Sequence, residues 1–180
     1  MFWRCLRLIK KVMPSQFVET IHDIDIEELR AKNIRAIITD LDNTLVEWHR
    51  PQATPEVLAW LSRMREAGIQ VTVVSNNNQE RVLRFCEPLG IRFIWAARKP
   101  LNRAFLRAIR EMDVRIEETV VIGDQLFTDI LGGNLLGFHT ILVVPVASTD
   151  GFWTRFNRRM ERIALYWMRR KGLITWKNHS

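Results

Sequence analysis

The chain has 180 residues, of which 47% are hydrophobic, and its formal net charge is +7. This length is enough for one substantial core with appendages and too short for two independent cores. No stretch approaches the roughly 18 uninterrupted apolar residues that a membrane-spanning helix needs, and basic residues interrupt the apolar N-terminus, so we expect a retained chain that does not cross a bilayer.

The chain begins and ends with basic segments that contain tryptophan. Residues 1–13 carry four basic residues and no acid, and residues 150–180 carry eight basic residues against two acids. Residues 14–149 carry fifteen basic and eighteen acidic residues. We therefore divide the chain into a basic amphipathic segment at 1–13, one central domain at 14–149, and a basic aromatic amphipathic helix at 150–180.

Within the central domain, short β-branched runs alternate with amphipathic stretches from Asn33 onward. Strands are expected at 35–40, 69–74, 93–96, 119–122 and 140–144. Helices are expected at 55–67, 80–88, about 100–112 and 129–136. This alternation is typical of an α/β fold in which crossover helices cover a parallel sheet.

Polar residues follow four of the expected strands. They are Asp40 and Asp42, Ser75, Lys99, and Asp124. Turns and helix caps favour such residue types, so each one alone has an ordinary structural explanation. In open α/β sheets, however, ligands bind at the carboxyl ends of the strands. The positions together therefore predict one site at one edge of the sheet.

The spacing of these residues resembles the four motifs of the haloacid dehalogenase (HAD) superfamily. Residues 40–45, DLDNTL, resemble the first motif, DxDx(T/V), and Ser75 resembles the second. Lys99 resembles the third, and residues 123–129, GDQLFTD, resemble the fourth motif in the form GDxxxxD. The resemblance implies a Rossmann-like parallel sheet with helices on both faces. It also implies a phosphatase, because phosphatases of the superfamily carry Asp at the second acidic position of the first motif.

The acidic residues suit hydrolysis of a phosphate monoester through a covalent intermediate. Asp40, held at a strand end, is the expected nucleophile, and Asp42 is the expected general acid and base. Mg²⁺ would let a carboxylate approach a phosphate dianion, with Asp40 and Asp124 as side-chain ligands. The family pattern adds the backbone carbonyl of Asp42 to the metal ligands.

The remaining motif residues are expected to support the substrate and the nucleophile. Ser75 would donate a hydrogen bond to a phosphoryl oxygen, and Lys99 would supply positive charge and orient the nucleophile. Thr44 and Asn76 are also assigned to substrate binding. Asp129 is expected outside the first ligand shell, holding Lys99 or a metal-bound water.

The intervals between the motifs leave no room for a cap domain. From Asp40 to Ser75, and from Ser75 to Lys99, the sequence holds one helix and one strand each. An open site suits a bulky substrate such as a phosphoprotein, a nucleic-acid end or a lipid headgroup. Residues 47–49, Glu-Trp-His, follow the first motif in a loop that either touches the substrate or holds a half-buried tryptophan and a solvated histidine.

The two cysteines, Cys5 and Cys86, are too few and too far apart for a disulfide framework or a zinc site. A reducing compartment, the cytosol, is therefore expected. The zinc loop of the related heptose-bisphosphate type is also excluded.

The C-terminal segment reads as an amphipathic helix. One stripe contains Trp153, Phe156, Met160, Ile163, Ala164 and Trp167, and the other side contains Arg155, Arg158, Arg159, Arg162, Arg169 and Arg170. Such helices lie in the interface of anionic membranes. The stripe would equally suit packing onto the domain or a second subunit. Nucleic acid is disfavoured, because the aromatic side chains lie opposite the charges and could not stack on bases while the arginines hold phosphates.

Residues 14–18, PSQFV, lead through Ile24, Asp25 and Leu29 to the first motif, and GDQLFTD follows at 123–129. Over residues 14–145, and most strongly at the first and last motifs, this arrangement resembles one capless HAD subclass IIIA family, the bacterial proteins related to mitochondrial phosphatidylglycerophosphate phosphatase. That resemblance implies removal of phosphate from phosphatidylglycerophosphate by a Mg²⁺-dependent enzyme. The expected location is cytoplasmic, peripheral on the inner face of the membrane. Two alternatives stay open: a soluble phosphatase of nucleotide or protein phosphate, and a non-catalytic module that binds RNA or a ribosome. The sequence leaves the oligomeric state unknown.

Overall fold

A computed structural model describes residues 11–147 of the chain. The segment 150–180 and most of the segment 1–13 lie outside these residues, and so does the amphipathic helix expected there. The strands are β1 (Gln16–Val18), β2 (Ala36–Thr39), β3 (Gln70–Val74), β4 (Arg92–Ile94), β5 (Thr119–Gly123) and β6 (His139–Val143). The helices are α2 (Ile26–Ala31), α3 (Pro55–Glu66), α4 (Gln79–Cys86), α5 (Arg103–Met112) and α6 (Leu131–Leu136). Single turns are η1 (Ile21–Asp23), η2 (Glu87–Leu89), η3 (Ile116–Glu118) and the π-helical η4 (Leu126–Ile130).

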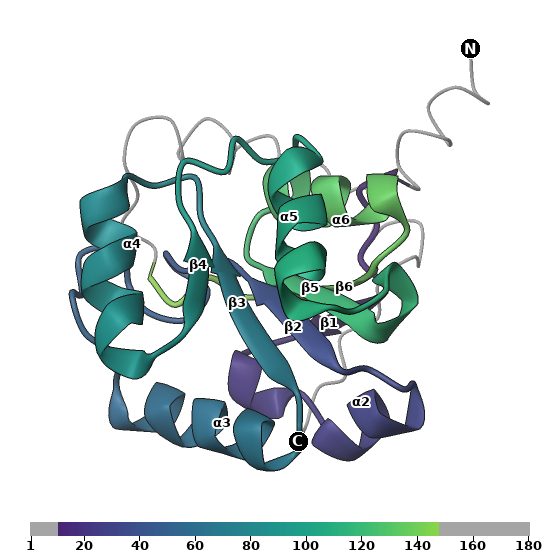
Figure 1. The fold of residues 1–180 in the computed structure, drawn as a ribbon, viewed down its shortest axis with the longest axis horizontal. Helices are drawn as coiled ribbons and strands as arrows, with labels where there is room; N and C mark the ends of the chain where they lie inside the picture. Colours follow the sequence, from purple (N-terminus) through teal and green to yellow (C-terminus); the bar gives the residue numbers. More distant parts are fainter. Residues whose placement is uncertain (1–10, 148–180) are drawn as a thin grey trace.

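The six strands form one sheet in the order β1-β6-β5-β2-β3-β4, and every neighbouring pair is parallel. Figure 1 shows these strands in the middle of the molecule with the helices around them. Because all strands run the same way, their carboxyl ends meet at one edge, which we call the catalytic edge. The expected Rossmann-like α/β fold is confirmed.

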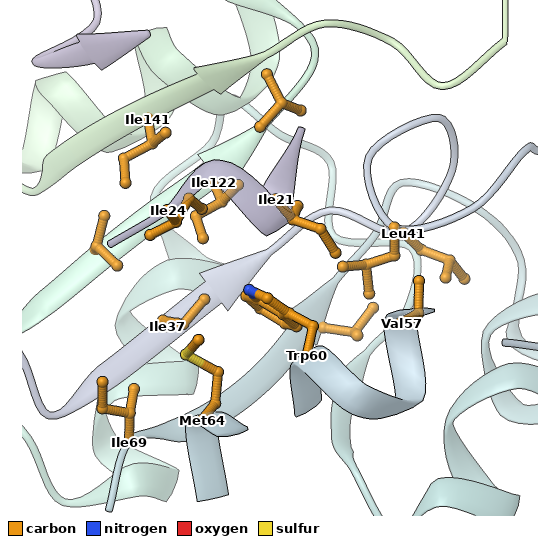
Figure 2. Packing of buried hydrophobic residues seen from close by; sticks show 14 of the residues in the cluster. Ile21, Ile24, Ile37, Leu41, Val57, Trp60, Met64, Ile69, Ile122 and Ile141 are labelled. Atoms are coloured by element: carbon orange, nitrogen blue, oxygen red, sulfur yellow. The ribbon is translucent and has the colours of Figure 1, made fainter. Parts of the chain in front are cut away.

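One face of the sheet is covered by α2, α3 and α4. Trp60 and Met64 of α3 are fully buried, and Figure 2 shows both side chains pointing toward Ile37 of β2. Thr54 caps the start of α3 by accepting a hydrogen bond from the backbone N–H of Val57. Burial of a large aromatic side chain contributes about 2–3 kcal/mol from area alone, so α3 is fixed firmly against the sheet.

The other face is covered by α5 and α6. Phe105 of α5 is fully buried in a second apolar cluster, which includes Ile38 of β2. In α6, two glycines allow close packing: a Cβ on Gly132 would lie 2.7 Å from the Phe105 ring, and one on Gly133 would lie 2.6 Å from Thr140 Cγ2. Because helices cover both faces of the sheet, a ligand can reach the strands only at their carboxyl ends or their amino ends.

The structure corrects several element boundaries and adds a sixth strand. The sequence pattern placed the first strand after Asn33, but β1 precedes it and pairs with β6. The strand expected at 93–96 ends at Ile94, because Ala96 and Arg98 have positive φ angles of 46° and 56° and turn the chain. The helix expected from about 100 begins at Arg103. Two crossovers, β2–β3 and β3–β4, contain only helical elements and loops, so a cap domain is absent there.

Within residues 11–147, no helix has both the length and the apolar character to span a bilayer.

Candidate active site

Two carboxylates lie side by side at the centre of the catalytic edge. Asp40 follows β2 and Asp124 follows β5, and these strands are neighbours, with Thr39 paired to Ile122. The backbone N–H of Asp40 donates to the carbonyl of Ile122 at 3.0 Å, which extends the pairing by one residue. Asp40 and Asp124 are 7% and 4% exposed. The register of the sheet therefore places the two side chains next to each other in a buried site.

Lys99 lies between two carboxylates of this edge. Its Nζ is 2.8 Å from Asp40 Oδ1 and 2.6 Å from Asp129 Oδ1. Burial favours the neutral amine, but the charges of Asp129 and Asp40 outweigh burial and raise the pKa of Lys99. For Asp129 the effect of burial is the opposite: it raises the pKa of the carboxyl group to about 6, although the charge of Lys99 opposes this shift. Lys99 is therefore a charged ammonium group aimed at Asp40.

The backbone of Lys99 is held by Asn76, which follows β3. The Asn76 side chain donates through Nδ2 to the carbonyl of Lys99 at 3.2 Å and accepts from its N–H through Oδ1 at 2.6 Å. The preceding residue, Ser75, is buried, and its Oγ accepts from the backbone N–H of Asn77 at 3.0 Å. The predicted substrate-binding residue Asn76 thus fixes the loop that carries Lys99.

Three aspartates form a buried group with the composition of a metal site. Oxygens of Asp40, Asp124 and Asp129 lie within 4.8 Å of one another. Thr44 Oγ1 donates to Asp124 Oδ1 at 3.1 Å, and Asp129 Oδ2 accepts from the backbone N–H of Gln125 at 3.2 Å. Carboxylate oxygens are hard ligands that suit Mg²⁺. The residues present therefore fit a divalent cation.

Asp42 is not one of these three carboxylates, and its side chain has partners that the sequence pattern did not indicate. Its Oδ1 is 2.9 Å from Arg81 Nη2 and accepts from Arg81 Nε at 3.0 Å, and its Oδ2 accepts from Asn77 Nδ2 at 2.9 Å. Burial, the largest influence, raises the pKa of Asp42, while Asn77 opposes it, Asp40 adds to it and Arg81 opposes it. The sequence signal that could have found Arg81 is its position in the first turn of the helix that follows Ser75.

Two hollows in the surface differ in their distance along the strands from the three buried aspartates. One of about 180 Å³ is lined by Thr44 together with Val144 and Val146, so it lies beside the first motif. A larger one of about 630 Å³ lies at the opposite edge of the sheet, next to Gln70 and Arg92, where β3 and β4 begin. No predicted site residue lines the larger hollow, so its size does not make it the catalytic site.

The chain belongs to the haloacid dehalogenase-like hydrolase family, whose profile matches residues 21–137. It is 59% identical over 170 residues to a protein of Bacillus subtilis named probable phosphatase YqeG, covering 94% of this chain and 99% of that one. It is 28% identical over 173 residues to phosphatidylglycerophosphate phosphatase 1, chloroplastic/mitochondrial, of Arabidopsis thaliana. That match covers 90% of this chain and 49% of the plant protein, so the chain spans about half the plant protein's length.

A solved structure shows the same fold. The cobalt-bound form of deoxy-D-mannose-octulosonate 8-phosphate phosphatase (YrbI) from Haemophilus influenzae superposes with a TM-score of 0.53 at 19% identity. The match covers 76% of this chain and 90% of the other. The expected class, an enzyme of the HAD-type phosphatases, is confirmed by the family match and by the B. subtilis relative. Within the described residues, the segments between β2 and β4 contain no cap domain.

Proposed function

We propose that the chain is a Mg²⁺-dependent phosphomonoesterase that converts phosphatidylglycerophosphate to phosphatidylglycerol through an aspartyl-phosphate on Asp40. The observation that carries the chemistry is the placement of the Lys99 ammonium 2.8 Å from Asp40 at the open catalytic edge. An ammonium at this distance orients the carboxylate and offers positive charge to the incoming phosphate. The plant relative, named for phosphatidylglycerophosphate, supports the choice of substrate.

In the first step, an oxygen of Asp40 attacks phosphorus and the ester P–O bond breaks. Asp42 gives its proton to the departing glycerol oxygen, which leaves as a hydroxyl group. The raised pKa of Asp42 favours the protonated form that this step needs. Lys99 and the Ser75 hydroxyl stabilise the negative charge on the phosphoryl oxygens.

In the second step, water attacks the phosphorus of the aspartyl-phosphate and Asp42, now a carboxylate, accepts the water's proton. The P–O bond to Asp40 breaks, which releases inorganic phosphate and restores the Asp40 carboxylate. Arg81 and Asn77 hold the Asp42 carboxylate by one hydrogen bond to each of its oxygens. These contacts favour the ionised form that the second step needs.

The metal would be held by Asp40 and Asp124, with the backbone carbonyl of Asp42. Asp129 stays outside this set because Lys99 contacts one of its oxygens and the Gln125 N–H contacts the other. When bound, Mg²⁺ neutralises charge that otherwise keeps a carboxylate and a phosphate dianion apart. Thr44 positions Asp124 through its hydroxyl group.

The proposed location is the cytoplasmic side of a membrane, with the protein bound peripherally. The supporting observation is the charge of the two terminal segments, which hold twelve of the 27 basic residues of the chain and only two of its 20 acids. Anionic lipids attract such segments with about 1 kcal/mol per nearby Lys or Arg, which is an upper bound for each residue. A lipid substrate and an open site agree with this placement.

The test is release of inorganic phosphate from phosphatidylglycerophosphate in mixed micelles with Mg²⁺. We expect turnover by the full chain, and for Asp40→Asn a loss of at least about 10³-fold with the fold retained, since Asn is nearly isosteric but lacks a nucleophilic carboxylate. Hydrolysis of p-nitrophenyl phosphate is measured alongside. Cleavage of that ester with an untouched lipid would discard the lipid substrate and keep the phosphatase.

A further inference from the structure

Exposed large hydrophobic side chains gather at the catalytic edge. Among the described residues, eight such side chains are exposed, and five of them follow the carboxyl ends of β2, β4 or β6. These five are Trp48, Trp95, Leu101, Val144 and Val146, and we call them the apolar rim. Single exposed hydrophobics are ordinary, but their gathering around a polar site marks a contact surface.

On the β4 side, the rim is tied directly to the site. The backbone N–H of Ala96 donates to the carbonyl of Asn77 at 2.9 Å, and that of Ala97 donates to the carbonyl of Ser75 at 3.0 Å. Trp95 precedes these two residues and is 45% exposed. Leu101, two residues after Lys99, is 58% exposed. Both hydrophobic side chains therefore project from the loop that delivers Lys99.

On the β6 side, the rim lies against the first motif. The backbone N–H of Val146 donates to the carbonyl of Asn43 at 2.9 Å. An exposed valine therefore lies beside Asn43, the residue that follows Asp42. Trp48 follows the same motif and is 49% exposed. Since β2 and β5 lie between β6 and β4 in the sheet, the rim flanks the aspartates on both sides.

Positive charge accompanies the rim. Arg98 is exposed between Trp95 and Leu101, and Arg103 is exposed at the start of α5. Neither guanidinium forms an ion pair with another described residue. Exposed tryptophan beside arginine is the composition that anchors proteins at the interface of an anionic bilayer.

We propose that the apolar rim is the surface that rests on an anionic lipid bilayer, so that the catalytic edge faces the headgroups. In the sequence, Val146 lies shortly before the segment 150–180, whose eight basic residues would add attraction to an anionic surface. The proposal deepens the proposed function and rests on it for the identity of the lipid substrate. It differs from attachment by the terminal segments alone, because it orients the folded domain.

The test compares how deeply two positions of the chain enter a membrane, with the same fluorophore attached at each. An environment-sensitive dye is attached at Leu101→Cys in the rim, or at Leu135→Cys, each in a full chain with Cys5→Ser. Leu135 is a matched control, since it is 46% exposed and lies at the end of α6, just before β6 begins at the opposite edge. Cys86 stays unlabelled, because burial raises the pKa of its thiol to about 12.

The probe membrane is a vesicle of phosphatidylglycerol and phosphatidylcholine whose acyl chains carry bromine. We expect several-fold stronger quenching at position 101 than at position 135. Equal quenching, stronger quenching at 135, or no vesicle binding would overturn the proposal. Quenching at 101 without any turnover of phosphatidylglycerophosphate would retain the rim as a membrane surface and reject the proposed substrate.

Discussion

The ammonium group of Lys99 lies 2.6 Å from Asp129 Oδ1, and the two side chains are only 3% and 1% exposed. A charge buried to this degree depends on all of its partners, since removing one of them leaves the ion less well compensated in the protein interior. Asp40 is the second partner of the same ammonium, at 2.8 Å. Lys99 thus links the nucleophile to a carboxylate that has no direct part in the proposed chemistry.

Replacing Asp129 should therefore destabilise the fold as well as the site. For Asp129→Ala we expect a loss of about 3–5 kcal/mol in the free energy of unfolding, measured by urea denaturation. The control is Glu111→Ala, which breaks an exposed pair with Arg107 and should cost less than about 1 kcal/mol. Similar losses in the two variants would show that the buried pair is no more important than a surface pair.

The contact between Arg81 and Asp42 should appear in the pH dependence of activity. Arg81 is one of the influences that lower the pKa of Asp42, against the larger effect of burial. Arg81→Gln removes its charge, so the pKa of Asp42 rises further. The first chemical step requires protonated Asp42, and the basic limb of kcat/KM should therefore move to higher pH.

The matched control for this shift is Arg84→Gln. Arg84 lies on the same helix, α4, but is exposed and pairs with Glu80. Its replacement should leave the basic limb in place. If Arg81→Gln folds normally and its pH profile coincides with that of Arg84→Gln, Asp42 is not the proton donor.

Much of the fold could be predicted because its strands are continuous β-branched runs. The stretches around Ile37 and Val121 are buried on both faces of a parallel sheet, and such strands lack competing helical periodicity. β1 was missed because it has only three residues, all half-buried, and its pairing partner lies more than a hundred residues away in β6. No local pattern contains that partner.

The site could be predicted only as far as its spacing was informative. Residues at successive strand ends must meet in a parallel sheet, so the convergence of Asp40, Asp124 and Lys99 follows from topology. The contact of Arg81 with Asp42 depends on how α4 leaves β3, and that geometry is set by tertiary packing. For the same reason, nothing local indicated that Asn76 would hold the backbone of the Lys99 loop.

Divalent metal should stabilise the protein through Asp124. A ligand that binds only the folded state raises the free energy of unfolding by about 2.7 kcal/mol at a hundred times its dissociation constant. We expect Mg²⁺ to raise the melting temperature of the wild type and EDTA to reverse the rise. Asp124→Asn should abolish both the rise and the phosphatase activity. A variant that retains the full rise would place the metal elsewhere.

His139, which lies at the edge of the sheet opposite the catalytic edge, should make the free energy of unfolding depend on pH. It begins β6, and its Nε2 is buried with no hydrogen-bond partner among residues 11–147. Burial lowers the pKa of His139; the charge of Lys32 lowers it further, and Glu28 opposes both. The unfolded chain therefore takes up a proton near the ordinary value of about 6.5, whereas the folded chain resists protonation.

His139 contributes to stability only while its side chain is neutral. The contribution of neutral His139 is fully present above about pH 6.5 and is lost as the pH falls from there toward the lower pKa of the folded state. We expect the free energy of unfolding of the wild type to decrease between about pH 7.5 and 5.5 more than that of His139→Gln, which cannot take up this proton. Urea denaturation of both proteins at the two pH values measures the difference. A decrease of the same size in both would assign the pH dependence to other groups, and a larger decrease in His139→Gln would mean that folding raises the pKa of His139.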